Sequence, residues 1–221
     1  MGLPSREIAR NRPGGQGVRP FEETVNKEPR ATARPNEREG VSLFEACSAA
    51  VLELSRDRTV AGPTRDRLLA ACLRAERFEP LAGQPYGRRV LFHDGQGGEV
   101  MLATWHGHAR TAPHEHGGAH GLVFVVSGTF EEREHTREGN GLGAVRSSRT
   151  WREGDGIVVA PEIVHDMTSQ TKGVTLHVYA GALAPFSLYD LARRETVRAT
   201  GGAWLPADSV LSRDAWEGPR K

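Results

Sequence analysis

The chain has 221 residues, and its 29 lysines and arginines against 28 aspartates and glutamates give a formal net charge of +1. This length fits one domain, or one domain with an extension, and such a domain buries about 70% of its unfolded surface without needing disulfides or a structural metal. The charge balance argues against a dedicated nucleic-acid binder, which needs a basic excess on one face. Two cysteines are too few for a disulfide framework or a cysteine-only zinc site.

Residues 1–39 combine many charged residues with proline and glycine and contain few apolar side chains. Ordering such a segment would cost more conformational entropy than burial could offset. We therefore expect a disordered N-terminal extension over residues 1–39, with a tail that binds nucleic acid or a partner as the alternative. A single domain is expected over residues 40–221.

No apolar run reaches the ~18 residues of a membrane span, and the N-terminus lacks the hydrophobic core of a signal peptide. These features favour a cytoplasmic protein. We expect it to be a monomer, with no membrane partner and no nucleic-acid partner.

Two helices are predicted over about residues 41–78, on either side of the Gly62-Pro63 break. Thr64 can cap the second helix. Cys47 and Cys72 lie on the apolar helix faces, which favours packed core thiols over ligands or nucleophiles. The two apolar stripes consist of Leu43, Phe44, Cys47, Val51 and Leu54, and of Leu68, Leu69, Cys72 and Leu73.

From residue 80 the pattern changes to short runs of β-forming residues separated by glycine-rich turns. Many short strands without long helices between them predict a sandwich or a small barrel. Residues 138–141 (Glu-Gly-Asn-Gly) lie between two polar strand candidates and are typical of a hairpin tip. The apolar runs are residues 90–92, 100–105, 122–126, 157–159 and 174–179.

His114 and His116 are two residues apart, so in a β-strand both side chains would project from the same face into a barrel. Imidazole suits iron, zinc, copper or nickel, and two such rings can share one ion. The alternative is a histidine-rich surface hairpin. The other histidines are expected at the surface or in loops, with His120 close enough to the pair to line a pocket; they are His93, His106, His108, His120 and His135.

Further along the chain, Gly128, the run Gly154-Asp155-Gly156, Pro161 and His165 follow the histidine pair in this order. The whole pattern resembles the two sequence motifs of the cupin superfamily, whose members are jelly-roll barrels (double-stranded β-helices) that bind a metal in the barrel mouth. The resemblance implies a mainly β fold, with the cupin barrel at about residues 80–185, short α-helices before it and a C-terminal extension after it.

The same resemblance implies that His114, His116 and His165 are the metal ligands. Cupins often add a glutamate where this chain has Gly121, so the resemblance does not extend to branches that bind manganese through three histidines and a glutamate. A third imidazole in place of a carboxylate raises the charge of the site by one. Such a site favours an anionic ligand, and a thiolate would serve.

Four local features are similar to the thiol dioxygenases among the cupins, and in particular to bacterial type I cysteine dioxygenases. They are Tyr86-Gly87-Arg88, Trp105, Gly121 (where animal enzymes carry a crosslinked cysteine) and Thr175-Leu176-His177-Val178-Tyr179. The last matches the family's Ser-x-His-x-Tyr with threonine for serine. The resemblance implies that Arg88, with Tyr86 nearby, binds the substrate carboxylate.

Alternation places Thr175, His177 and Tyr179 on one strand face. The Thr175 hydroxyl can accept from or donate to one nitrogen of His177, and the other nitrogen can hold the Tyr179 phenol. The alternative is that His177 and Tyr179 merely fill the barrel. For Arg88, the alternative is a solvated charge at a strand end.

The resemblance implies an Fe(2+)-dependent enzyme that adds both atoms of dioxygen to a small-molecule thiol, converting L-cysteine to cysteine sulfinate. Thr175, His177 and Tyr179 would be catalytic, and Arg88 would grip the carboxylate as a bidentate fork. Two alternatives stay open. One is a dioxygenase for another thiol acid, such as 3-mercaptopropionate or mercaptosuccinate, and the other is a non-catalytic metal-binding cupin that acts as a sensor.

Overall fold

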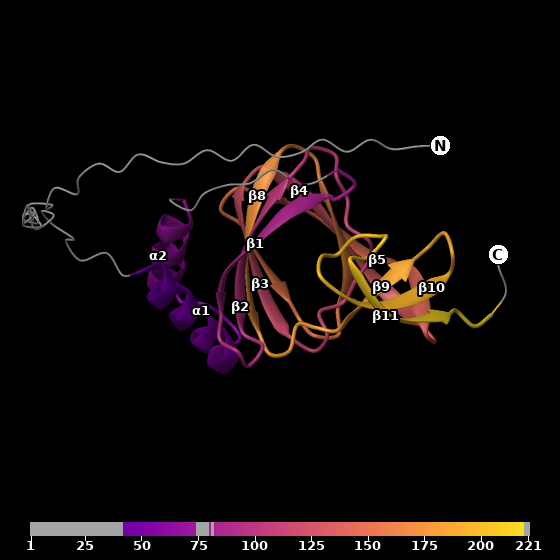
Figure 1. Ribbon diagram of the computed structural model, residues 1–221. Coiled ribbons are helices and arrows are strands. Elements are labelled where there is room, and N and C mark those ends of the chain that lie inside the picture. Colours follow the sequence, from indigo (N-terminus) through magenta and orange to yellow (C-terminus); the bar gives the residue numbers. More distant parts are fainter. Residues whose placement is uncertain (1–41, 74–79, 81, 219–221) are drawn as a thin grey trace, which may run out of the picture. The chain divides into compact units, whose positions relative to one another are not determined.

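The computed structural model describes residues 42–73, 80 and 82–218. The predicted N-terminal extension, residues 1–39, lies outside the described residues, so its boundary with the domain stays a prediction. Helices α1 (Leu43–Asp57) and α2 (Gly62–Cys72) come first (Figure 1). The strands that follow are β1 (Tyr86–His93), β2 (Glu99–Trp105), β3 (His120–Ser127), β4 (Thr129–Glu138), β5 (Gly141–Arg152), β6 (Gly156–Val159), β7 (Val164–Ser169), β8 (Gly173–Ala180), β9 (Phe186–Asp190), β10 (Glu195–Thr200) and β11 (Ser209–Ala215).

The strands form an antiparallel jelly roll. One sheet has the order β1-β2-β8-β3-β6, and a three-stranded sheet has the order β5-β4-β7. Strands distant in sequence are neighbours, because β8 pairs with both β2 and β3. The prediction of a mainly β cupin barrel preceded by short α-helices is confirmed.

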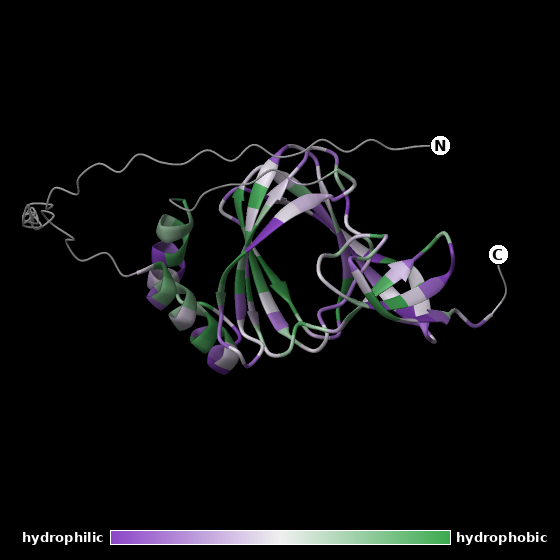
Figure 2. Cartoon of the chain, viewed as in Figure 1, coloured by the Kyte–Doolittle hydropathy of each residue, from purple (hydrophilic) through white to green (hydrophobic). Residues whose placement is uncertain are grey.

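Strands β2, β3 and β8 are buried on both faces, which explains their continuous apolar runs. Even-numbered residues such as Leu102 and Leu176 pack against α1 and α2. Odd-numbered residues such as Met101, Val123 and Tyr179 face the barrel interior. Figure 2 shows hydrophobic residues on the helices and on the strands beside them. Because alternation has period two, the same strands both support the helical layer and line the interior.

Helix α1 begins at a capping box. The Ser42 hydroxyl accepts from the amide of Glu45 at 3.2 Å, and the Glu45 carboxylate accepts from the Ser42 amide at 2.9 Å. Helix α2 begins earlier than predicted, after Ala61, because Pro63 suits the first helical turn. The prediction that Thr64 caps α2 was therefore wrong. Thr64 lies within the first turn of α2, and its hydroxyl donates to the Glu53 carboxylate at 2.5 Å.

The two cysteines are packed core thiols, as predicted. Cys47 and Cys72 are buried, and burial raises the pKa of each thiol to about 12, so neither is a nucleophile at neutral pH. Two residues of the predicted apolar stripes do not pack in the core: Phe44 is 66% exposed and Leu73 is 60% exposed. Neither α1 nor α2 is long and apolar enough to cross a membrane, and these are the helices that the described residues contain.

The hairpin between β4 and β5 turns at residues 139–140, as predicted. The region after residue 185, expected only as an extension, forms a third sheet of order β11-β10-β9. The strands of this sheet carry fewer consecutive apolar residues than β2, β3 and β8 do. The core of β9 and β10 consists of Phe186, Leu188, Val197 and Ala199. This sheet contributes directly to the candidate site.

Leu54→Ala should lower the free energy of unfolding by about 2–5 kcal/mol, because Leu54 is 1% exposed between α1 and the sheet. Leu52→Ala is the matched control on the same helix, since Leu52 is 48% exposed and should cost about 0.5 kcal/mol or less. Denaturant unfolding monitored by circular dichroism measures both values. Equal losses would contradict the packing of α1 described above.

Candidate metal centre

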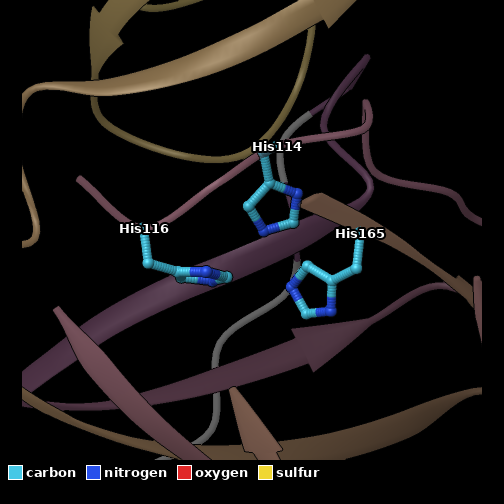
Figure 3. A group of neighbouring side chains, drawn as sticks. All are labelled: His114, His116 and His165. Carbon is cyan, nitrogen blue, oxygen red and sulfur yellow. The ribbon is translucent and has the colours of Figure 1, made fainter. Parts of the chain in front are cut away.

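Three histidines meet inside the barrel (Figure 3). One ligand atom from each of His114, His116 and His165 lies within 4.8 Å of the others, and all three residues are buried. His165 comes from β7. His114 and His116 lie between β2 and β3, outside the named strands, where His114 makes isolated bridges to His165 and Leu188. The prediction that the pair lies on a strand was wrong, but the two imidazoles still converge, with ring centroids 4.9 Å apart.

The hydrogen bonds of these rings leave nitrogen lone pairs available. Nδ1 of His114 donates to the Ala112 carbonyl at 2.9 Å, and Nδ1 of His165 donates to Glu132 at 2.6 Å, which leaves Nε2 of both rings as an acceptor. Nδ1 of His116 is buried without a hydrogen-bond partner.

Burial lowers the pKa of His114 to about 3 and that of His116 well below its usual value, so both rings are neutral at neutral pH. Metal ligation requires neutral imidazoles. Three imidazole nitrogens, from His114, His116 and His165, fit a divalent transition metal.

Glu132 supports this centre, and the sequence analysis missed it. Its carboxylate accepts from Nδ1 of His165 through one oxygen and from Nε1 of Trp151 at 2.9 Å through the other. A carboxylate behind a ligating histidine fixes the ring orientation and raises its basicity. The available signal was alternation in β4, where Phe130 and Glu132 are both buried, but the charged run around Glu132 suggests a solvated edge.

A chain of hydrogen bonds leads from Trp105 toward the histidine cluster. Nε1 of Trp105 donates to the Thr175 hydroxyl at 2.8 Å, Thr175 lies 2.7 Å from Nε2 of His177, and Nδ1 of His177 lies 3.0 Å from the Tyr179 hydroxyl. The structure thus brings together the three residues predicted as catalytic. Their roles in catalysis stay a prediction.

The numbers of donors and acceptors determine the direction of the hydrogen bonds from Trp105 to Tyr179. Thr175 is fully buried, and its recorded partners are Trp105 and His177. Because an indole N–H can only donate, the Thr175 proton has one acceptor, Nε2 of His177. Nδ1 of His177 therefore carries the ring proton and donates it to Tyr179. Burial raises the pKa of the Tyr179 phenol, so its own O–H remains available for a group in the cavity.

Gly121 makes room for Tyr179. A Cβ at Gly121 would lie 2.8 Å from Cε1 of Tyr179, too close for any other residue to fit without displacing the ring. The Tyr179 ring also stacks on the His116 ring, with ring centroids 5.4 Å apart. Tyr179 is thus held beside the histidine cluster by packing as well as by His177.

Arg88 and Tyr86 line the same pocket as His114, His116 and Tyr179. The Tyr86 hydroxyl accepts from the Ala203 amide at 3.1 Å. Residues of the third sheet and of the loops around it close this pocket, so the C-terminal region completes the site; they are Phe186, Gly201 and Ala203.

Arg88 is not the free fork that the sequence analysis expects. Its Nη2 donates to both carboxylate oxygens of Glu99, at 2.7 and 2.9 Å, and its Nε lies 3.1 Å from the sulfur of Met101. Glu99 thus occupies Nη2 and Met101 occupies Nε, and Nη1 is the guanidinium nitrogen for which the described residues show no partner. The alternative of a freely solvated charge fits no better, because the Arg88 side chain is 26% exposed.

Among the residues that the structure describes, the other histidines join no metal-ligand cluster. His93 and His108 are exposed, and His106 and His120 are half-buried. His135 differs from its surface prediction: its side chain is 5% exposed, and Nε2 lies 2.6 Å from the buried carboxylate of Asp166. Strand β4 places it there, opposite β7.

No protein-family model matches the sequence, and no curated protein matches it. Solved structures with similar folds include KdgF from a Halomonas species (16% identity, 44% of this chain and 79% of that chain, TM-score 0.37). Another is a protein with a double-stranded β-helix domain from Klebsiella pneumoniae (23% identity, 51% and 90%, TM-score 0.40). A third is an RmlC-like cupin from Shewanella frigidimarina (19% identity, 48% and 84%, TM-score 0.38). The strand order described above is that of a jelly-roll barrel, and the buried histidine cluster inside it could hold a metal ion.

Glu132→Gln should weaken metal binding by about 10–100-fold, because the amide is a poorer acceptor for the His165 N–H. Glu131→Gln is the matched control, since Glu131 accepts from Ser148 on the outside of the same strand. Competition with a chelator, using zinc or ferrous iron, measures both affinities. Equal affinity of the Glu132 variant and the wild type would show that this carboxylate does not support the metal site.

His177 should be the Nδ1–H tautomer in the metal-free protein. Nitrogen-15 NMR of histidine-labelled protein distinguishes this tautomer from the Nε2–H form, and His177→Gln assigns the signal. The ring should also stay neutral down to about pH 4, because burial, and to a smaller extent the neighbouring His165 and Arg88, lower the pKa of His177 to about 3. An Nε2–H signal would reverse the direction of the hydrogen-bond chain.

Proposed function

We propose that this protein is an iron-dependent thiol dioxygenase that adds both atoms of dioxygen to the sulfur of a small thiol, with L-cysteine as the substrate that its sequence motif favours. The observation that carries the proposal is the series of hydrogen bonds that ends on Tyr179 beside the three buried histidines. A barrel that only binds metal has no need for a buried, directed proton donor at this position.

Ferrous iron held by His114, His116 and His165 would supply the site at which the thiolate sulfur and dioxygen react. The overall step balances without an outside reductant: the sulfur loses four electrons, dioxygen gains them, and two S–O bonds form to give a sulfinate. The third imidazole in place of a carboxylate leaves the centre more positive, which favours binding of the anionic thiolate.

The residues around the centre have separate roles in this proposal. The Tyr179 O–H donates to the oxygen atoms where negative charge develops, and its position is set before the reaction by His177 and Gly121. Thr175 holds the His177 tautomer. Tyr86 and Arg88 line the space for the rest of the substrate.

The experiment is anaerobic reconstitution with ferrous iron followed by oxygen uptake with a panel of small thiols, with sulfinate identified by mass spectrometry. His165→Ala should lose most of its iron and its thiol-dependent oxygen uptake. His120→Ala is the control, because His120 is a half-buried neighbour outside the cluster, and it should keep both.

Bound iron without thiol-dependent oxygen uptake in the wild type would contradict the proposal and favour the non-catalytic sensor. Near-stoichiometric iron in His165→Ala would contradict the three-histidine centre.

A further inference from the structure

The segment that carries His114 and His116 changes its register on β7. Arg110 pairs with Thr168 and His114 pairs with His165, both in antiparallel orientation. The two residues of the segment are four positions apart in the chain, whereas their partners on β7 are three positions apart. The segment therefore contains one extra residue between the two pairs, which is a β-bulge.

The bulge decides which face of β7 the two histidine ligands share. Successive strand residues point to opposite faces, so a shift of one residue turns every side chain to the other face. His165 and Met167 line the interior pocket, whereas Val164 packs in a separate cluster with Tyr189. Without the extra residue, His114 would lie opposite Val164 and would face away from the interior.

An ion pair holds the register on the side of the bulge away from the histidines. Nε of Arg110 donates to one oxygen of Asp166 at 3.1 Å, and Nη2 donates to the other at 3.0 Å. Asp166 is fully buried and precedes Thr168, the pairing partner of Arg110, by two residues on β7. Diagonal side chains on one face of a sheet can reach each other in this way. A shift of one residue would turn Arg110 to the opposite face and break the pair.

The main-chain hydrogen bonds do not select this register by themselves. The Thr111 amide donates to the Met167 carbonyl at 2.9 Å, and His114 and His165 exchange two main-chain hydrogen bonds at 2.8 and 2.9 Å. Any residue can form such bonds, so side chains specify which residues meet. Where the bulge begins, the Met167 amide donates to the Thr111 hydroxyl at 2.9 Å, so a side chain completes the pairing there.

Asp166 has other partners, and they come from a strand that needs no such support. Nη2 of Arg133 donates to Asp166 at 2.9 Å, and Nε2 of His135 lies 2.6 Å from its second oxygen. Both residues belong to β4, whose ladders to β5 and β7 hold it on both sides. Arg110 is thus the partner that ties Asp166 to the segment with the histidines.

We infer that Arg110 and Asp166 are positioning residues for the metal centre, because their ion pair fixes the bulged register that turns His114 and His116 toward His165. Neither Arg110 nor Asp166 lines the pockets that contain the histidines, so both act through the main chain. The inference rests on the candidate metal centre and not on thiol oxidation.

The test compares two arginines that bind the same carboxylate. Arg110→Gln removes the link to the histidine segment and leaves Asp166 paired with β4; the Arg110 side chain is 41% exposed, so glutamine fits there. Arg133→Gln is the matched control, because it removes an equal charge from Asp166 and leaves the histidine segment attached. Chelator competition measures zinc affinity, and the absorption spectrum of bound cobalt(II) reports the ligand set. Hydrogen exchange of single amides is followed by NMR on the metal-free protein.

Arg110→Gln should weaken zinc binding by about tenfold or more, as when a group that orients a metal ligand is removed, and should change the cobalt(II) spectrum. The amides of His114 and His165 should lose protection from exchange relative to the β3–β8 ladder, because they bond to each other only in the bulged register. Arg133→Gln should keep the wild-type affinity, spectrum and protection. Arg110→Lys keeps the charge without the fork and should recover part of the affinity, which also tests the inference if Arg110→Gln does not fold.

Wild-type zinc affinity in Arg110→Gln would overturn the inference, and so would full protection of the His114 and His165 amides in that variant. Equal losses in Arg110→Gln and Arg133→Gln would also overturn it, because the arginines would then only stabilise the fold. A wild type that binds zinc but oxidises no thiol would remove the proposed function and leave this inference standing. A wild type that binds no metal would remove both.

Discussion

Every polar side chain inside the barrel must find its partner there, and the rest of the site depends on this constraint. A buried hydroxyl or imidazole without a partner loses its hydrogen bonds to water without compensation. Thr175, His177 and Tyr179 satisfy one another in a line, and His165 is satisfied by Glu132. Because each of these side chains has only one or two partners, counting donors and acceptors assigns the position of each proton. Among the buried groups of the described residues that lack a hydrogen-bond partner, Nδ1 of His116 lies at the place where a metal would bind.

Two of the four tryptophans, Trp105 and Trp151, are the outermost donors of these hydrogen-bonded groups. An indole N–H can only donate, so Trp105 forces the Thr175 proton toward His177, and Trp151 holds the second oxygen of Glu132 as an acceptor. Both are large residues at strand ends whose rings also pack in or against the interior cluster. The same side chains therefore fill the barrel and orient its polar groups.

The charges at the mouth of the site are balanced rather than purely cationic. The guanidinium of Arg88 is paired with the Glu99 carboxylate, whose two oxygens lie 2.7 and 2.9 Å from Nη2. The Arg88 side chain is 26% exposed and the Glu99 side chain is 10% exposed. Solvent therefore screens this ion pair less than it screens a pair on the surface.

Patterns of period two and period 3.6 are local, so the sequence was sufficient for the apolar strands, the helices before them, the buried cysteines and the hairpin at residues 139–140. The resemblance to the cupin sequence motifs likewise implied a shared site for His114, His116 and His165. Three features depended on contacts between distant segments and could not be derived in this way. The partner of Arg88 is on another strand, the carboxylate behind His165 is 33 residues away from it, and the donor that sets the direction of the Thr175 hydroxyl is 70 residues away. The sequence by itself determines the charge and the hydrogen-bonding groups of each residue. Strand pairing decides which of these groups become partners, because only the register of the sheets brings side chains from distant segments within 3 Å of each other.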